Sequence, residues 1–175
     1  MEVSAENIVS LFKGFLEDGF VEGHTTSRME GVKRPIESKC AWIKVKQKYF
    51  HRTVTFLKDI SSPHISTPMA SKELEGGGLE LIYPFTIFSG EGNFRELPVI
   101  ISVELPHDDL RIRSVADIVP GIIFMERETQ EMLGVEIESI PDGRRLFTPV
   151  SIRGTYPMRG KPFEKSDNEA EETGS

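Results

Sequence analysis

Three stretches of the chain carry apolar residues at the three-to-four-residue spacing of amphipathic helices. The first follows Ser4, a good helix cap, and Gly19 is its expected C-cap; its apolar stripe is Ile8, Leu11, Phe12, Phe15 and Leu16. The second helix is expected over residues 47–59. The third is expected over residues 118–133, and Gly134 just past its end is the residue that most often terminates a helix.

Strands are expected where apolar residues alternate with polar ones or run between turn signals. Five segments meet one of these descriptions: residues 20–28, 41–46, 64–72, 79–88 and 97–105. Pro68 places the third of them at a sheet edge, because proline has no amide hydrogen to donate to a neighbouring strand. Loops or turns are expected between the strands, at residues 31–39, 76–78, 89–93 and 107–114.

The pattern changes after residues 1–140, which form the expected folded domain. Residues 141–163 hold four prolines, no periodicity and a net charge of +4, so we expect an extended basic arm. Residues 164–175 carry a net charge of -4 and no apolar cluster, and we expect them to be disordered. The arm could lie along a partner, with these apolar residues as its anchors: Leu146, Phe147, Tyr156 and Phe163.

Composition excludes several classes of function. The net charge of -7 argues against a nucleic-acid partner. Four scattered His and the single Cys40 provide no ligand spacing for zinc or an iron–sulfur cluster, and no phosphate-binding loop is present, so no cofactor is expected. The lone Cys shows that disulfides do not hold the fold together, so we expect an intracellular protein. No apolar run approaches the roughly 18 residues that span a bilayer, so we expect no direct membrane insertion. Five Gln and Asn in total favour a thermophilic source.

The densest polar cluster lies in residues 125–134. Glu126, Arg127 and Glu128 are consecutive, so on a helix they point about 100° apart and cannot all face solvent. At least one of these charges should therefore lie at a buried edge or at an interface. The simpler alternative is a solvated helix face, on which Arg127 and Glu131 form an i, i+4 pair.

The order of motifs around this cluster resembles the 30 kDa subunit family of respiratory complex I. The matching residues are Pro120, Gly121, Glu126-Arg127-Glu128, Glu131, Gly134, Arg144-Arg145, and Tyr156-Pro157 with Arg159. The flanking segments FLKD, PHIST, ELIYPF and SVADIVPG resemble the branch of this family found in energy-converting membrane-bound [NiFe]-hydrogenases and the related sulfane sulfur reductase.

The resemblance implies an α+β fold: a two-layer α/β domain with a mixed, largely antiparallel sheet of about five strands, followed by the extended arm. It also implies a cofactor-free, non-catalytic subunit on the cytoplasmic side of a membrane-bound, ferredoxin-linked respiratory complex. Its expected partners are the large catalytic subunit and the small iron–sulfur subunit. We expect these residues to bind partners or support the interface: Glu126, Arg127, Glu128, Glu131, Arg144, Arg145, Tyr156, Pro157 and Arg159.

Three alternatives remain open from the sequence. The protein could serve a quinone-reducing relative of complex I, since protons, sulfane sulfur and quinone are all compatible acceptors. It could be a soluble adaptor outside any respiratory complex. It could also be an independent enzyme with Glu126 and Glu128 as acid and base, but side chains on different sides of a helix cannot flank one small substrate.

Overall fold

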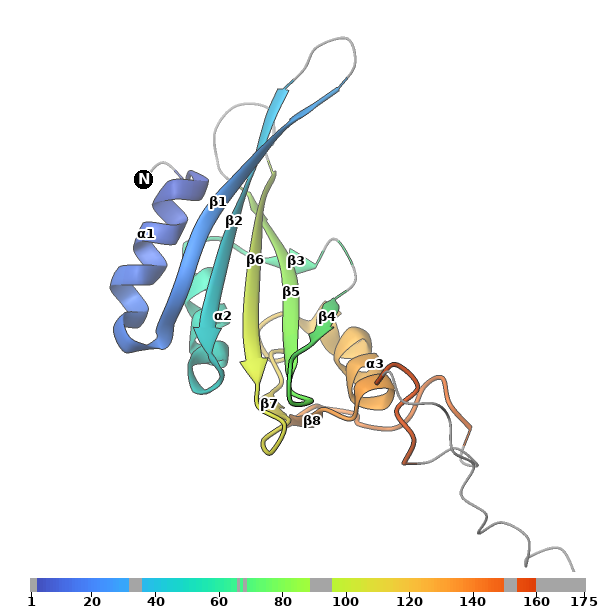
Figure 1. Cartoon of the computed structure of the whole chain (residues 1–175). Coiled ribbons are helices and arrows are strands. Elements are labelled where there is room, and N and C mark those ends of the chain that lie inside the picture. The colour runs from blue at the N-terminus through green and yellow to red at the C-terminus, as the bar shows by residue number, and fades with distance from the viewer. Residues whose placement is uncertain are drawn as a thin grey trace, which may run out of the picture.

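A mixed sheet with helices on one face forms the body of the molecule in a computed structural model, which describes residues 3–31, 36–65, 67, 69–88, 96–149 and 154–159. Within these ranges the sheet has six strands in the order β1-β2-β6-β5-β3, and β4 also pairs with β5 (Figure 1). Only β2 and β6 run parallel, and the other pairs are antiparallel. The strands are β1 (Phe20–Glu30), β2 (Ile36–Lys46), β3 (His64–Ile65), β4 (Ala70–Glu73), β5 (Leu79–Phe88) and β6 (Glu96–Leu105).

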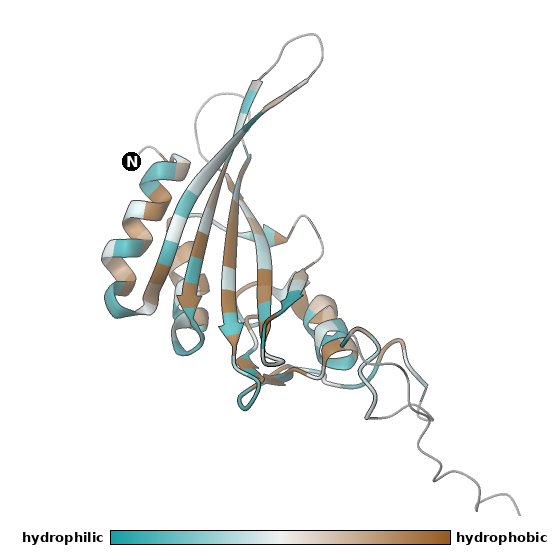
Figure 2. Ribbon diagram, viewed as in Figure 1, coloured by the Kyte–Doolittle hydropathy of each residue, from teal (hydrophilic) through white to brown (hydrophobic). Residues whose placement is uncertain are grey.

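Two helices, α1 (Ala5–Leu16) and α2 (Phe50–Ile60), cover one face of this sheet. The hydroxyl of Ser4 accepts a hydrogen bond from the Asn7 amide at 3.2 Å, which confirms the expected cap. The rings of Phe15 and Phe56 stack with centroids 3.8 Å apart and join the two helices. Apolar residues concentrate along the central strands and the inner sides of the helices (Figure 2). The α+β class is thus confirmed, with six strands where about five were expected.

The region between β1 and β2 was predicted wrongly in part. Residues 36–39 were expected to be loop, but they begin β2 and pair with the far end of β1, where Ser27 faces Lys39. Most side chains of this ribbon are exposed, so no apolar alternation marks it in the sequence. Segment 64–72 contains two short strands rather than one, and both Pro68 and the expected turn at residues 89–93 lie outside the described residues.

A second, two-stranded parallel sheet joins β7 (Arg111–Arg113) to β8 (Glu136–Glu138). Residues 107–114 were expected to be loop, and β7 corrects that expectation, because its partner strand comes only after the third helix in the sequence. Between these strands lie a 3-10 turn, η3 (Pro120–Ile122), and helix α3 (Ile123–Leu133). The helix therefore begins later than residue 118, since the preceding amides of Ile118 and Val119 both bond to the carbonyl of Val115 in a separate turn.

Two glycines terminate or pack against helices in different ways. Gly134 is the C-cap of α3, in the left-handed conformation at φ 71°, as expected. Gly19 is not the C-cap of α1, because that helix ends at Glu17 with φ 46°. Gly19 instead lies against the ring of Tyr49, and an added Cβ would approach that ring within 2.4 Å.

Candidate functional site

The candidate site is the surface where α3 holds the C-terminal arm, here meaning the described residues 141–149 and 154–159. Ile122, the N-cap of α3, and Leu133, its last residue, are buried in the core. The polar side chains of the helix lie on two other sides. One side faces β7 and the segment that follows it. The other side faces the arm, which wraps past the helix in Figure 1.

Glu126 is fully buried on the side of α3 that faces β7. Its carboxylate accepts hydrogen bonds from the Ser114 hydroxyl at 2.5 Å and the Val115 amide at 3.0 Å. Burial raises the pKa of the Glu126 carboxyl above its usual value, although these two donors oppose the shift. The hydroxyl of Tyr83 is also buried, and it has no hydrogen-bond partner among the described residues. Burial and the neighbouring Glu126 hold the pKa of this phenol well above its usual value.

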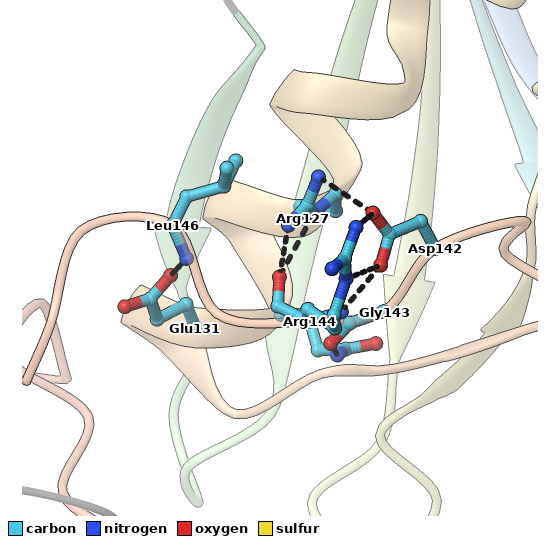
Figure 3. A network of polar contacts seen from close by, with 7 residues as sticks. Arg127, Glu131, Asp142, Gly143, Arg144 and Leu146 are labelled. Carbon is cyan, nitrogen blue, oxygen red and sulfur yellow. Dashed lines mark hydrogen bonds and ion pairs between the residues drawn. The ribbon is translucent and has the colours of Figure 1, made fainter. Parts of the chain in front are cut away.

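Arg127 lies on the other side of α3, with only 8% of its surface exposed. Its Nε donates to the carbonyl oxygen of Arg144 at 2.9 Å, its Nη2 donates to the same oxygen, and its Nη1 lies 3.4 Å from Oδ2 of Asp142 (Figure 3). Asp142 also forms a two-pronged ion pair with the Arg144 guanidinium, at 2.9 and 2.8 Å. Arg144 and then Arg127 lower the pKa of the Asp142 carboxyl.

Glu131, one turn further along α3, binds the next part of the arm. Its carboxylate accepts hydrogen bonds from the amides of Leu146 at 2.7 Å and Phe147 at 3.1 Å, and from both the amide and the hydroxyl of Thr148. Burial alone would raise the pKa of this carboxyl, but the Thr148 hydroxyl and the three backbone amides lower it to about 2. The Glu131 side chain therefore fixes the path of three consecutive residues.

Weaker contacts continue along the arm. The Gln130 side chain donates to the carbonyl of Gly143 at 3.2 Å, and the Met158 amide donates to the carbonyl of Met132 at 3.1 Å. The ring of Tyr156 lies against Gly134, where an added Cβ would approach it within 2.7 Å.

Arg159 reaches from the arm to the turn between β4 and β5. Its Nη2 donates to the carbonyl of Gly77 at 3.1 Å, while its buried Nη1 has no hydrogen-bond partner within the described part of the chain. The turn itself matches expectation, with Gly76 and Gly77 both at φ 84°. The arm is thus fixed to the folded body at several points along its length.

The outer side of the arm and its surroundings remains open. The Arg144 side chain is 86% exposed, although its backbone and head group hold Asp142. Five large apolar side chains are also exposed, and we call them the apolar patch: Phe124 at 62%, Leu146 at 38%, Phe147 at 61%, Tyr156 at 44% and Met158 at 63%. A cavity of about 270 Å³ is lined by Tyr156 together with Arg127, Arg144 and Arg145.

The structure separates the residues that the sequence grouped together. Arg127, Glu131 and Arg144 come together at the arm, whereas Glu126 faces the opposite side of α3 and Glu128 is exposed. The expectation that at least one charge of this triplet is buried is confirmed, and the solvated-face alternative holds only for Glu128. The i, i+4 ion pair does not form, because each partner binds the arm instead.

The remaining predicted residues differ in their surroundings. Arg145 donates to the Thr148 hydroxyl at 2.9 Å, and Pro157 is exposed beside Tyr156. Sequence reasoning missed Ser114, Asp142 and Thr148 as the partners of the α3 charges. The one available signal was the Pro141-Asp142 step, which is separated from the basic pair by Gly143 alone.

Metal ligation and membrane crossing find no support in the described part of the protein. Its residues contain no group of three His, Cys, Asp or Glu side chains arranged to hold a metal ion. Within the same ranges, no helix combines the length and the apolar character that crossing a bilayer requires.

Several proteins of known type are similar to this chain in sequence. It is 27% identical over 132 residues to the membrane-bound hydrogenase subunit beta of Pyrococcus furiosus, covering 73% of this chain and 75% of that protein. It is 39% identical over 84 residues to the chloroplastic NAD(P)H-quinone oxidoreductase subunit J of Cryptomeria japonica, covering 48% and 52%. It is 32% identical over 75 residues to the C/D subunit of the NADH-quinone oxidoreductase of Salmonella typhimurium, covering 40% of this chain but 13% of that protein.

Solved structures share the fold. A trypsin-resistant fragment of Nqo5 superposes with a TM-score of 0.56 at 15% identity, covering 79% of this chain and 99% of the fragment. A chain of an archaeal membrane-bound sulfane sulfur reductase superposes with a TM-score of 0.55 at 19% identity, covering 87% and 79%. At these identities the likeness establishes the fold alone.

The family assignment rests on a match that spans most of the chain. The profile described as "Respiratory-chain NADH dehydrogenase, 30 Kd subunit" matches residues 43–168, which include most of the sheet, α3 and the arm. The chain belongs to the respiratory-chain NADH dehydrogenase 30 kDa subunit family.

Proposed function

We propose that this protein is a cofactor-free structural subunit of a membrane-bound, ferredoxin-linked respiratory complex of the hydrogenase or sulfane sulfur reductase type. In this proposal it lies on the cytoplasmic side, in the peripheral arm of the complex, and holds the large catalytic subunit beside the small iron–sulfur subunit. The names of its relatives, a membrane-bound hydrogenase subunit and a sulfane sulfur reductase complex, support this setting.

The observation that carries the proposal is a fixed arm with an uncovered apolar surface. Arg127 and Glu131 hold the backbone of residues 144–148, so the arm loses little conformational freedom when a partner binds. Phe147 on this fixed backbone is 61% exposed, and Tyr156, whose ring lies against Gly134, is 44% exposed. Large aromatic side chains and Arg are the residue types that carry most binding energy at protein interfaces.

The charges of α3 therefore act on the partner indirectly in this proposal. Arg127 and Glu131 position the arm, whereas the apolar patch and the exposed Arg144 make the contact itself. Redox centres and ion translocation belong to other subunits, and the protein supports electron transfer by holding the cluster-bearing subunits in place.

A quinone-reducing relative of complex I is the second candidate. It is favoured by the 39% identity to a quinone oxidoreductase subunit, although that match covers only 48% of this chain. Both candidates place the protein against a large subunit, and they differ in the electron acceptor.

Purification of the tagged protein from membranes of its own host tests the proposal. We expect stoichiometric recovery of a large subunit and an iron–sulfur subunit that resist a salt wash. Four metal-ligating cysteines in the large subunit would indicate a hydrogenase. The loss of some of these cysteines would indicate a complex with a different electron acceptor. Recovery of the protein as a soluble monomer without these subunits would contradict the proposal and favour an adaptor outside any respiratory complex.

A further inference from the structure

A second surface, separate from the arm, carries an unusual concentration of positive charge. A groove of about 500 Å³ lies between the beginning of α2 and the two-stranded sheet of β7 and β8. We call it the basic groove. On the helical side it is lined by residues of η2 (Gln47–Tyr49) and α2, and on the other side by β7 and β8. None of its lining residues belongs to the arm.

Basic side chains outnumber acidic ones in this groove, although the whole chain has a net charge of -7. The basic residues are Lys48, His51, Arg52, Arg111 and Arg113, and the acidic ones are Asp109 and Glu138. Asp109 is already engaged, because it accepts from Arg111 Nε at 2.7 Å and from the Gln47 amide at 3.2 Å. One of the two acidic side chains that line the groove is therefore already paired within the protein.

The helical side of the groove is not neutralised by the protein. Lys48 and Arg52 have no carboxylate within 4.0 Å among the residues that the structure describes; each lies over an aromatic ring instead. On the opposite side, Arg113 is only loosely paired, at 3.9 Å from Asp117. Asp117 lies closer to His51, at 3.0 Å.

The cations form two short rows along the groove. Lys48 lies in η2 and Arg52 four residues later in α2, which follows η2 directly. Side chains four residues apart on a helix lie about 6 Å from each other on one face. Arg111 and Arg113 are two residues apart in a strand, which places them on the same side about 6.6–6.8 Å apart. Alternate side chains of an extended peptide have this same spacing.

We propose that the basic groove binds an extended, acidic segment of a partner protein. Alternate carboxylates of such a segment would lie between the two rows and pair with Lys48 and Arg52 on one side and Arg113 on the other. A flat anionic membrane is a poorer fit, because Glu138 in the groove and Asp117, which contacts His51 and Arg113, would be pressed against its headgroups. The contact is independent of the arm and would add a second attachment point within a complex.

Binding of a defined acidic peptide to the full-length protein tests this assignment. The probe is a fluorescein-labelled eight-residue peptide of alternating Glu and Ser, and its control replaces every Glu with Gln. Fluorescence anisotropy at about 50 mM salt should detect binding of the Glu peptide only, and the affinity should fall as salt increases because exposed charges are screened. The double variant Lys48→Gln/Arg52→Gln should weaken binding at least fivefold.

The double variant Lys13→Gln/Lys58→Gln is the matched control. It removes the same charge from exposed positions on α1 and α2 that do not line the groove, and it should change the affinity less than twofold. Thermal unfolding of each variant verifies that the fold is retained. If a variant unfolds early, the wild-type protein provides the test instead. Its amide chemical shifts should then change on peptide addition at residues 47–52 and 111–113.

Four results would overturn the assignment. The first two are that no form of the protein binds the Glu peptide, or that both double variants lose the same affinity for it. The other two are that phosphatidylglycerol vesicles bind the groove more tightly than the peptide does, or that the peptide binds only to a protein that ends at Phe163. The last result would mean that the protein's own acidic residues 164–175 compete for the groove.

Discussion

Two carboxylates on α3 are almost inaccessible to solvent, yet their pKa values move in opposite directions. Glu126 has two hydrogen-bond donors and full burial, and burial dominates, so its pKa is raised. Glu131 accepts from three amides and a hydroxyl, and these donors outweigh burial, so its pKa falls to about 2. The number of donors around each of these carboxylates therefore decides the direction in which its pKa moves.

Replacing Glu131 with Gln should release the arm. Gln can accept from fewer of the amides of residues 146–148, and its amide group would face other donors, so we expect a loss of about 2–3 kcal/mol at pH 7. Because the folded-state pKa is lowered, the stability that Glu131 contributes is present above about pH 4.5 and is lost as the pH falls towards about 2. Urea unfolding over this range should show the two proteins converging in acid.

Glu128→Gln is the control for this substitution, since Glu128 is exposed on the same helix. It should leave the unfolding free energy unchanged within about 0.5 kcal/mol. Hydrogen exchange of the amides of residues 146–148 should accelerate in Glu131→Gln alone. Equal exchange in both variants would show that the carboxylate does not hold the arm.

Glu126→Gln should have the opposite dependence on pH. A raised folded-state pKa means that the stability Glu126 contributes is fully present below about pH 4.5 and is lost as the pH rises through the folded-state pKa. Gln stays neutral and can still accept from the Val115 amide, so the variant should gain on the wild type as the pH rises from 4.5 to 8. Urea unfolding at several pH values measures this difference, and a constant gap across the range would contradict the assignment.

At the scale of elements, α3 and the arm depend on one glycine. Gly134 ends the helix at φ 71°, and the Tyr156 ring lies directly against it. Gly134→Ala should therefore cost at least about 1–2 kcal/mol, because an L side chain is strained in the left-handed region and its Cβ would meet the ring at 2.7 Å. Thermal unfolding should show this loss as a melting temperature below that of the wild type.

Gly121→Ala is the matched control for Gly134→Ala. It lies in the turn that begins α3, its backbone is not in the left-handed region, and an added Cβ would meet nothing within 4 Å. We expect no loss of stability there. A similar loss at both glycines would mean that neither the cap nor the ring contact is responsible.

Elements that face the core could be predicted from the sequence, whereas elements stabilised by distant partners could not. Helices α1 and α2 and strands β5 and β6 bury alternate or periodic apolar residues, so their positions were predicted within a few residues. The first part of β2 and the whole of β7 are mostly exposed and owe their conformation to pairing with another strand. That pairing leaves no local pattern to read.

The same distinction applies to the candidate site. Three consecutive charges on one helix predicted that some would be buried, since a helix cannot turn all of them outward. Which ones are buried depends on where residues 114 and 142–148 lie, and these segments have no periodicity of their own. The resemblance to the family singled out Arg127 and Glu131 without revealing that these two side chains bind the arm.

At the scale of the whole molecule, charge is distributed unevenly between the body, residues 1–140, and the C-terminal segment that follows it. The body has a net charge of -7 and the arm, residues 141–163, a net charge of +4. Among the described residues, the apolar core includes none after Ile140, so we expect the body to fold without the arm. Without the arm, Arg127 and Glu131 would face water, where charged side chains are readily solvated.

Two truncations separate folding from assembly. A protein that ends at Ile140 should unfold cooperatively, because its core is complete, yet it should no longer hold the large subunit through a salt wash. A protein that ends at Phe163 should assemble like the full-length form, since residues 164–175 are acidic and offer no apolar anchor. Co-purification from the host at equal expression levels gives the stoichiometry of each. If the shorter form still retains its partner in full, the arm is not the attachment point, and the contact must lie on the sheet or on the exposed side of α3.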